Sequence, residues 1–136
     1  MKNKFTAGIC IIVLVIAPFL VFATSNSEPQ HTTLPLYNSI SSEEAKRMLD
    51  EDDNVILLDV RTEAEHSVEK IPGSIVIPIN ELEMRILDKF SDKSTQIIIY
   101  CQGGVRSKAA VELLIDLGYT NIYDLGGIVD WKYSTE

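Results

Sequence analysis

Residues 97–107 read Ile97-Ile98-Ile99-Tyr100-Cys101-Gln102-Gly103-Gly104-Val105-Arg106-Ser107, and this stretch carries most of the functional information in the chain. Its first four residues are apolar and mostly β-branched, which is typical of a central strand covered on both faces. Apolar residues then recur at helical spacing up to Gly118, at Ala109, Ala110, Leu113, Leu114 and Leu117. Cys101 therefore lies where a buried strand ends and a helix is about to begin.

Cys101 can be interpreted in two ways. A cysteine after an apolar strand is most often a small buried hydrophobe. In this loop, however, backbone N–H groups and the positive end of the following helix stabilise an anion such as a thiolate. Gly103 and Gly104 let the backbone turn tightly and approach a ligand, and Arg106 adds a permanent cation whose planar shape suits oxyanions. The combination favours a reactive thiol.

The rest of the chain alternates predicted helices and strands. Before the central strand we expect a helix at 42–49 after the capping box Ser41-Ser42-Glu43-Glu44, a strand at 55–58, a short helix after a second capping box at 62–65, a strand at 74–77 and a helix at 80–87. After it we expect a strand at 121–123 and a final turn up to Trp131, a predicted core residue. In the helix at 80–87, Asn80 should be the cap, and Leu82, Ile86 and Leu87 should face inward.

This alternation of strands and helices predicts the fold class. We expect an α/β fold built on a small, doubly wound parallel sheet that is flanked by helices on both faces. In such sheets ligands bind at the carboxyl ends of the strands. Cys101 occupies such a position.

The first 23 residues differ from the rest of the chain. Lys2 and Lys4 precede an uncharged stretch from Phe5 to Ala23, so residues 1–23 are predicted to be a signal peptide or an N-terminal membrane anchor. Membrane attachment would then run through residues 5–23. Residues 24–36 are rich in Ser, Thr, Pro, Asn and Gln and are predicted to be a flexible tether. The folded domain should occupy 37–136 and lie outside the cytoplasm, as a secreted or periplasmic protein or on the outer face of the membrane.

Charge and cysteine content narrow the functional classes. The chain carries a net charge of −8, and residues 1–23 hold two lysines and no acids, so the remainder is more acidic still. This charge argues against nucleic acid and anionic membrane surfaces as partners. Cys101 is the only cysteine after residue 23, so it has no partner for an internal disulfide. We expect neither a metal nor a cofactor.

From Tyr37 to Trp131 the chain resembles the single-domain rhodaneses, which are thiosulfate and persulfide sulfurtransferases. Five pieces in the same order carry the resemblance: Leu58-Asp59-Val60-Arg61 with Glu65, Ile71-Pro72-Gly73-Ser74, Tyr100 to Ser107, Leu117-Gly118-Tyr119, and Gly126-Gly127 ahead of Trp131. The resemblance implies that Cys101 attacks the outer sulfur of a donor such as thiosulfate and becomes a persulfide. It then passes that sulfur to a thiophilic acceptor, which could be cyanide, a thiol or a protein cysteine.

The resemblance also implies roles for the neighbouring residues. Arg106 would bind the oxyanion of the donor and lower the pKa of the thiolate, while the amides of the loop would bind the substrate and stabilise the persulfide. Those amides belong to Gln102, Gly103, Gly104 and Val105 in addition to Arg106. Supporting positions are Asp59, Arg61, Glu65 and Ser107. Asp59 and Arg61 should lie near the rim, and Arg61 should pair with Glu65.

Three alternatives remain beside this interpretation. Phosphatases and arsenate reductases with a cysteine loop have five residues between Cys and Arg, whereas Cys101 and Arg106 are separated by four, so the cradle is narrower and that chemistry is disfavoured. His66 could act as a general base, and together with Glu69 and Lys70 it departs from the family pattern and bears on specificity. The domain could also be an extracytoplasmic persulfide carrier, a relay or an interaction module with little turnover.

Overall fold

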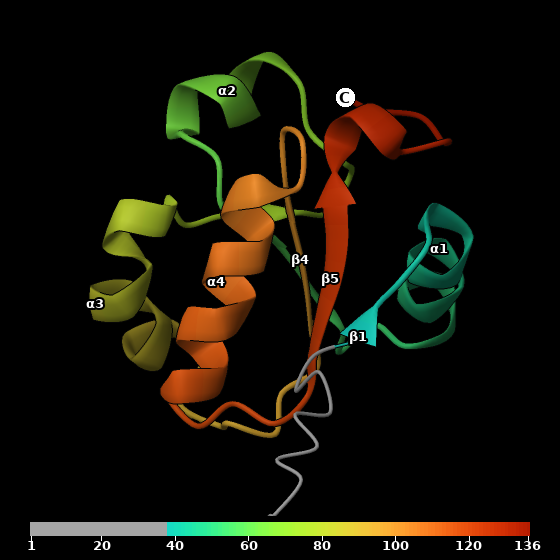
Figure 1. Cartoon of the computed structure of the whole chain (residues 1–136). Coiled ribbons are helices and arrows are strands. Elements are labelled where there is room, and N and C mark those ends of the chain that lie inside the picture. Colours follow the sequence, from blue (N-terminus) through green and yellow to red (C-terminus); the bar gives the residue numbers. More distant parts are fainter. Residues whose placement is uncertain (1–37) are drawn as a thin grey trace, which may run out of the picture. The chain divides into compact units, whose positions relative to one another are not determined.

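A computed structural model describes residues 38–136 (Figure 1). The predicted signal peptide or anchor at 1–23, the predicted tether at 24–36 and Tyr37 all lie outside the described residues. Within residues 38–136, no helix combines the length and apolar character needed to cross a membrane.

The described residues form one parallel sheet in the order β1-β5-β4-β2-β3. Its strands are β1 (Asn38–Ser39), β2 (Ile56–Asp59), β3 (Ile75–Val76), β4 (Ile97–Cys101) and β5 (Ile122–Gly127). Asp59 is in register with Tyr100, and Cys101 is in register with Gly127. The carboxyl ends of β2, β4 and β5 therefore meet at one edge, which is the predicted place for a site.

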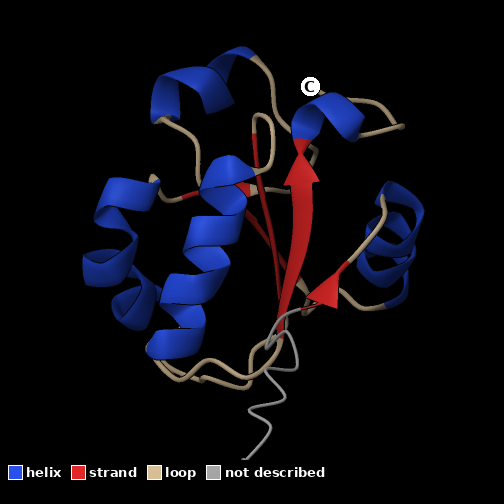
Figure 2. Ribbon diagram, in the orientation of Figure 1, coloured by secondary structure: helices blue, strands red, loops and turns tan. Residues whose placement is uncertain are grey.

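Helices cover both faces of the sheet. They are α1 (Ser42–Glu51), α2 (Glu63–Val68), α3 (Ile79–Lys89) and α4 (Val105–Asp116), followed by a 3₁₀ turn at Ile128–Asp130. Figures 1 and 2 show α3 and α4 on one face and α1 on the other, while α2 lies beyond the ends of the strands. This arrangement confirms the predicted doubly wound α/β fold.

The central strand β4 shows why both faces must be covered. Ile97 and Ile99 pack with residues of α3 and α4, whereas Ile98 and Tyr100 pack with residues of α1. Successive side chains of a strand point to opposite faces, so an unbroken apolar run needs a layer on each side. All five residues of β4 are buried, including Cys101 at its end.

The third helix differs from the sequence prediction. It begins at Ile79, after Pro78, and has no side-chain cap, so Asn80 is not the cap. The reason is that the Ile79 N–H donates to the Val60 carbonyl oxygen, which ties the start of α3 to the end of β2. Leu82 and Ile86 are buried as predicted, but Leu87 is 42% exposed because it lies off the face that these two residues share.

The lengths of two strands were also predicted incorrectly. β5 runs on through Gly127, because its second half pairs with β4 up to Cys101, and β3 is confined to Ile75–Val76. Of the two predicted capping boxes, that of Thr62 and Glu65 is complete. At α1, Ser41 accepts a hydrogen bond from the Glu44 N–H. These local signals place α1 and α2 as the sequence predicted.

Candidate active site

Cys101 lies at the carboxyl end of β4, with only 1% of its surface exposed. Gly104 adopts a left-handed conformation (φ 91°) at the N-terminus of α4, and its N–H lies 3.1 Å from Cys101 Sγ in a donating geometry. A side chain at Gly104 would be strained in this conformation. The sulfur thus has a backbone donor at the positive end of a 12-residue helix, a place that stabilises negative charge on a bound group.

The backbone at the end of β5 packs directly against the cysteine loop. Gly127 lies so close to the loop that a Cβ atom there would be 2.6 Å from the Gln102 carbonyl oxygen and 2.9 Å from Gly103 Cα. A shift in the register of β4 and β5 after Ile99 brings Gly127 opposite Cys101. Gly127 is therefore needed for the close approach of the end of β5 to the loop.

Arg106 is held by Glu65. Its Nη1 and Nη2 donate to Glu65 Oε2 and Oε1 at 2.9 and 2.7 Å, so the guanidinium and carboxylate form a bidentate pair between α4 and α2. The hydrogen bonds from Arg106 lower the pKa of Glu65, helped by the backbone N–H of Thr62 in the capping box. The same partner raises the pKa of Arg106. The cation of the loop is therefore positioned by the short helix α2.

The predicted pairing of Arg61 with Glu65 is wrong, and so is the placement of Asp59 and Arg61 at the rim. Both side chains are buried, and Arg61 donates to Asp59 through Nε at 3.0 Å and Nη2 at 2.7 Å. The Arg61 N–H also donates to Asp59 Oδ1 at 2.8 Å. This local turn brings two residues of the same strand end together, and Glu65 is left to pair with Arg106.

The Asp59–Arg61 pair connects the elements around the loop. Arg61 donates to the Glu69 carbonyl oxygen at 2.6 Å and to Gln102 Oε1 at 3.2 Å, and His66 Nδ1 lies 3.0 Å from Asp59 Oδ2. Burial acts to raise the pKa of Asp59, but hydrogen bonds from Arg61 and His66 outweigh it and hold that pKa below its ordinary value. His66 is thus a partner of a buried carboxylate at the end of β2.

Two further buried residues near the loop, Ser107 and Tyr100, make side-chain hydrogen bonds. Ser107 is buried and donates to the Gly104 carbonyl oxygen at 3.0 Å, in line with a supporting position. Tyr100 was not singled out from the sequence: its hydroxyl accepts from the Ile71 N–H at 3.3 Å and lies 2.9 Å from Ser74 Oγ. Burial raises the pKa of Tyr100 to about 12. A buried tyrosine needs a hydrogen-bond partner for its hydroxyl. Because Tyr100 ends an apolar strand, the sequence alone indicated that this hydroxyl would be buried and bonded.

Glu69 and Lys70, which also depart from the family pattern, contact the C-terminal segment. The backbone of Lys70 exchanges two hydrogen bonds with that of Glu136, at 2.8 and 2.9 Å, and Lys70 Nζ lies 3.5 Å from Glu136 Oε1. The Glu69 side chain accepts from Thr135 Oγ1 at 3.0 Å. Residues 69 and 70 therefore fasten the C-terminal segment to the end of α2.

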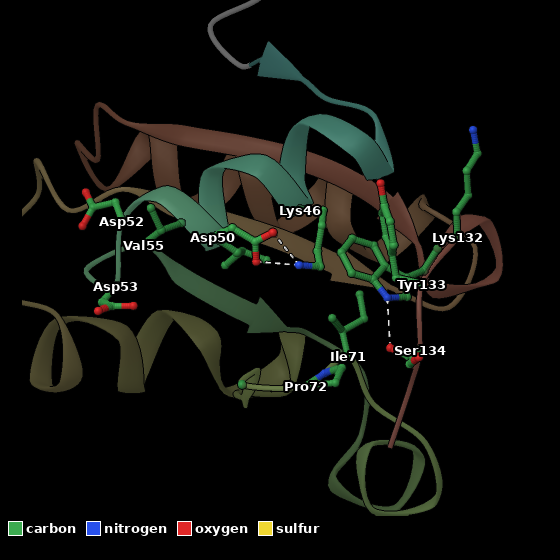
Figure 3. Close-up of a pocket in the computed structure, with 13 residues that line it drawn as sticks. Lys46, Asp50, Asp52, Asp53, Val55, Ile71, Pro72, Lys132, Tyr133 and Ser134 are labelled. Atoms are coloured by element: carbon green, nitrogen blue, oxygen red, sulfur yellow. Dashed lines mark hydrogen bonds and ion pairs between the residues drawn. The ribbon is translucent and has the colours of Figure 1, made fainter.

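Two hollows on the surface of the described residues bear on the site. One of about 370 Å³ adjoins the loop, and its lining comprises Arg61, Ala64, Glu65, Val68, Glu69 and Gln102. A larger one, of about 720 Å³, lies between α1, the turn at 71–73 and residues 131–134, and no residue of the cysteine loop lines it (Figure 3). Trp131, the predicted core residue, is only partly buried and lines this second hollow. In residues 38–136 no group of three His, Cys, Asp or Glu side chains is arranged to hold a metal ion.

Comparison with known proteins gives the family. The sequence model of the rhodanese-like domain matches residues 41–134, and the chain belongs to the rhodanese family. It is 33% identical to a sulfurtransferase of Allochromatium vinosum over 71% of this chain and 89% of that protein. It is 36% identical to the thiosulfate sulfurtransferase PspE of Escherichia coli over 54% of this chain and 70% of that protein.

A solved structure agrees with this assignment. A rhodanese with anions from Escherichia coli, 32% identical, superposes with a TM-score of 0.57 over 60% of this chain and 96% of the other. The family and the named relatives support sulfur transfer as the general activity of this chain.

The contact between Gly127 and the loop gives a first prediction. Gly127→Ala should lower the rate of sulfur transfer by about 100-fold, because the new methyl group displaces the loop that carries Cys101. The rate is measured as thiocyanate formed from cyanide, with thiosulfate supplied as a test donor. Gly73→Ala is the control: its φ of 79° costs an alanine about 1 kcal/mol of backbone strain, but its Cβ would meet nothing within 4 Å, so this variant should retain sulfur transfer. Unchanged transfer in Gly127→Ala would contradict the close approach.

The buried ion pair gives a second prediction. Asp59→Asn should lower the free energy of unfolding by about 3 kcal/mol, because it leaves the buried Arg61 charge without its counter-ion. Urea unfolding at pH 7 measures the change. Asp50→Asn, which breaks the exposed pair with Lys46, should cost less than about 1 kcal/mol. Equal losses of unfolding free energy in the two variants would show that the buried pair stabilises the fold no more than the exposed pair does.

Proposed function

We propose that this chain takes a sulfane sulfur from a donor such as thiosulfate, holds it on Cys101 as a persulfide and transfers it to a thiophilic acceptor. One observation carries the proposal: Cys101 Sγ lies at the N-terminus of α4 with the Gly104 N–H directed at it. The relative named thiosulfate sulfurtransferase supports the choice of donor.

The first half of the reaction loads the cysteine. The Cys101 thiolate attacks the outer sulfur of thiosulfate, an S–S bond forms to Sγ, and the original S–S bond breaks so that sulfite leaves with its electron pair. The loop amides from Gln102 to Arg106 then face a persulfide anion in place of the thiolate. Both forms carry a single negative charge on sulfur, so the same donors serve before and after loading.

The second half releases the sulfur. A nucleophilic acceptor attacks the outer sulfur of the persulfide, the bond to Sγ breaks, and Cys101 leaves as the thiolate that began the cycle. With cyanide as acceptor the product is thiocyanate. No base is required for a thiolate that the loop already stabilises, so His66 serves better as the partner of Asp59 than as a proton acceptor.

Arg106 supplies the charge that a dianionic donor requires. Its guanidinium is about one-third exposed and lies against Glu65, so it is reachable from solvent and held in one orientation. A bidentate guanidinium can present further N–H groups to a donor oxyanion. We assign Arg106 to donor binding and Glu65 to its positioning.

The proposal includes a location outside the cytoplasm. The positive residues Lys2 and Lys4 followed by an uncharged stretch support a chain that is exported or anchored by residues 5–23, with the domain outside the cytoplasm.

The alternative function is that of a sulfur carrier. A persulfide carrier with little turnover would use the same loop. Turnover with a small acceptor distinguishes the two functions.

The function is tested on the purified chain by intact mass. We expect a gain of one sulfur atom after thiosulfate, and its loss with formation of thiocyanate after cyanide. Cys101→Ser should abolish the gain while circular dichroism and the unfolding midpoint stay close to those of the wild type. A stable gain without release would support a carrier, and a gain in the Cys101→Ser variant would overturn the mechanism.

Donor binding by Arg106 is tested separately. Arg106→Ala should lower kcat/KM for thiosulfate by about 10- to 100-fold, because a charged contact to the oxyanion is lost. Lys108→Ala is the matched control, since Lys108 is an exposed cation in the same helix, and it should change kcat/KM by less than about twofold. If both substitutions lowered kcat/KM equally, Arg106 would act only through its positive charge and not through a specific contact with the donor.

A further inference from the structure

The larger hollow, between α1, the turn at 71–73 and residues 131–134, is separate from the cysteine loop, which supplies none of its lining residues. Its volume of about 720 Å³ is within the range of small-molecule pockets. Its apolar lining consists of Leu49, Val55, Ile71, Pro72, Trp131 and Tyr133. Apolar walls together with a few charged groups are typical of a site for a small molecule.

Hydrogen bonds hold one wall of the hollow in place. Residues 131–134 are tied to α1, because the Lys132 N–H donates to Ser42 Oγ at 3.2 Å. Beyond this segment, two backbone hydrogen bonds join Glu136 to Lys70. The C-terminal segment is thus fastened on both sides of the residues that line the hollow, which makes the hollow a preformed feature of the fold.

Trp131 and Tyr133 form what we call the aromatic end of the hollow. Their ring centroids are 5.2 Å apart, with an edge-to-face angle of 63° between the planes. Tyr133 is 40% exposed, and Trp131 is only partly buried. Rings that pack on one another and remain accessible offer a rigid apolar surface at a low cost in conformational entropy. An apolar group can therefore pack at this end.

Both lysines in the lining are paired within the chain. Lys46 Nζ lies 2.5 Å from Asp50 Oδ1, and Lys132 Nζ lies 2.5 Å from Glu43 Oε1. Their positive charges are therefore compensated by neighbouring carboxylates. Among the described residues, the lining offers no unpaired lysine to an anionic ligand.

Two further carboxylates, which we call the acidic end, lie at the other end of the hollow. Figure 3 shows Asp52 and Asp53 away from Lys132 and Tyr133. Neither takes part in an ion pair with a residue of 38–136. Hydrogen bonds from Asn54 lower the pKa of Asp52, so this carboxylate stays charged. Asp52 is also the C-cap of α1, so the negative end of that helix adds to the charge.

We infer that this hollow binds a small organic cation, a molecule with an apolar or aromatic body and an ammonium or guanidinium group at one end. The body would pack on the aromatic end, and the cationic group would lie at the acidic end. An elongated molecule fits best, because the paired side chains of Lys46 and Asp50 lie between the two ends (Figure 3). This site is independent of the proposed sulfur transfer, and its test requires no turnover.

The test uses the fluorescence of Trp131, which is the only tryptophan of the chain and lines the hollow. The purified chain is titrated with phenylbutylamine, phenylbutanol and phenylbutyrate, which share one body and differ in charge. We expect a saturable change in fluorescence and a Kd for the amine about fivefold lower than that for the alcohol, as an exposed ion pair would give. The carboxylate should bind most weakly. Equal Kd values for the amine and the alcohol, or no saturable change with any probe, would overturn the inference.

Two variants assign the ends of the site. Asp53→Asn should reduce the advantage of the amine over the alcohol to about twofold, because one of the two carboxylates is lost. Asp88→Asn is the matched control, since Asp88 is an exposed carboxylate on α3 outside the lining, and it should keep the full advantage. Tyr133→Ser should weaken the amine and the alcohol alike, by up to about tenfold. The unfolding midpoint of each variant, measured in the same samples, shows that the fold persists.

The test also distinguishes a small molecule from a segment of another protein. The peptide Gly-Phe-Gly-Lys-Gly, blocked at both ends, carries an aromatic and a cationic group on an extended backbone. We expect it to bind no more tightly than phenylbutylamine. Much tighter binding of the peptide would overturn the inference in favour of a peptide occupant, and so would a full advantage of the amine in Asp53→Asn, which would place its cationic group elsewhere.

Discussion

The buried ion pair of Asp59 and Arg61 is the constraint on which the site depends. Burying two charges is costly unless their remaining hydrogen-bonding groups are satisfied. Here that requirement is met by His66, the Glu69 carbonyl group and the Gln102 side chain, which belong to α2, to the residue after it and to the cysteine loop. The need to satisfy one ion pair therefore fixes the position of α2 relative to the end of β4.

The positioning of Arg106 follows from this first pair. Because the Arg61 guanidinium is directed at Asp59, the Glu65 carboxylate on α2 is available to the cation of the loop. The capping box then holds Glu65 in place through Thr62. A helix of six residues, too short to be stable alone, thus links the buried pair to Arg106, the cation of the loop.

The sequence predicted the elements of the fold and the cysteine loop because these depend on local patterns: the apolar run of β4, the helical spacing of α4 and the glycines between them. It failed where distant residues compete for one partner. Residue 65 is four positions from Arg61 and 41 from Arg106, and only the folded chain shows which pair forms. The start of α3 depends likewise on a hydrogen bond to Val60. Local sequence pattern also does not show why residue 127 must be glycine, because the reason is its contact with the cysteine loop.

The charge of the whole chain and the charge around the cysteine loop act in opposite directions on an anionic donor of the proposed reaction. The chain is acidic overall, which opposes the approach of an anionic donor, so the donor must be attracted locally by Arg106 and the N-terminus of α4. These groups lie in the loop and beside it. The attraction that a donor anion needs is thus supplied within the loop and by α2, which holds Arg106 in place through Glu65.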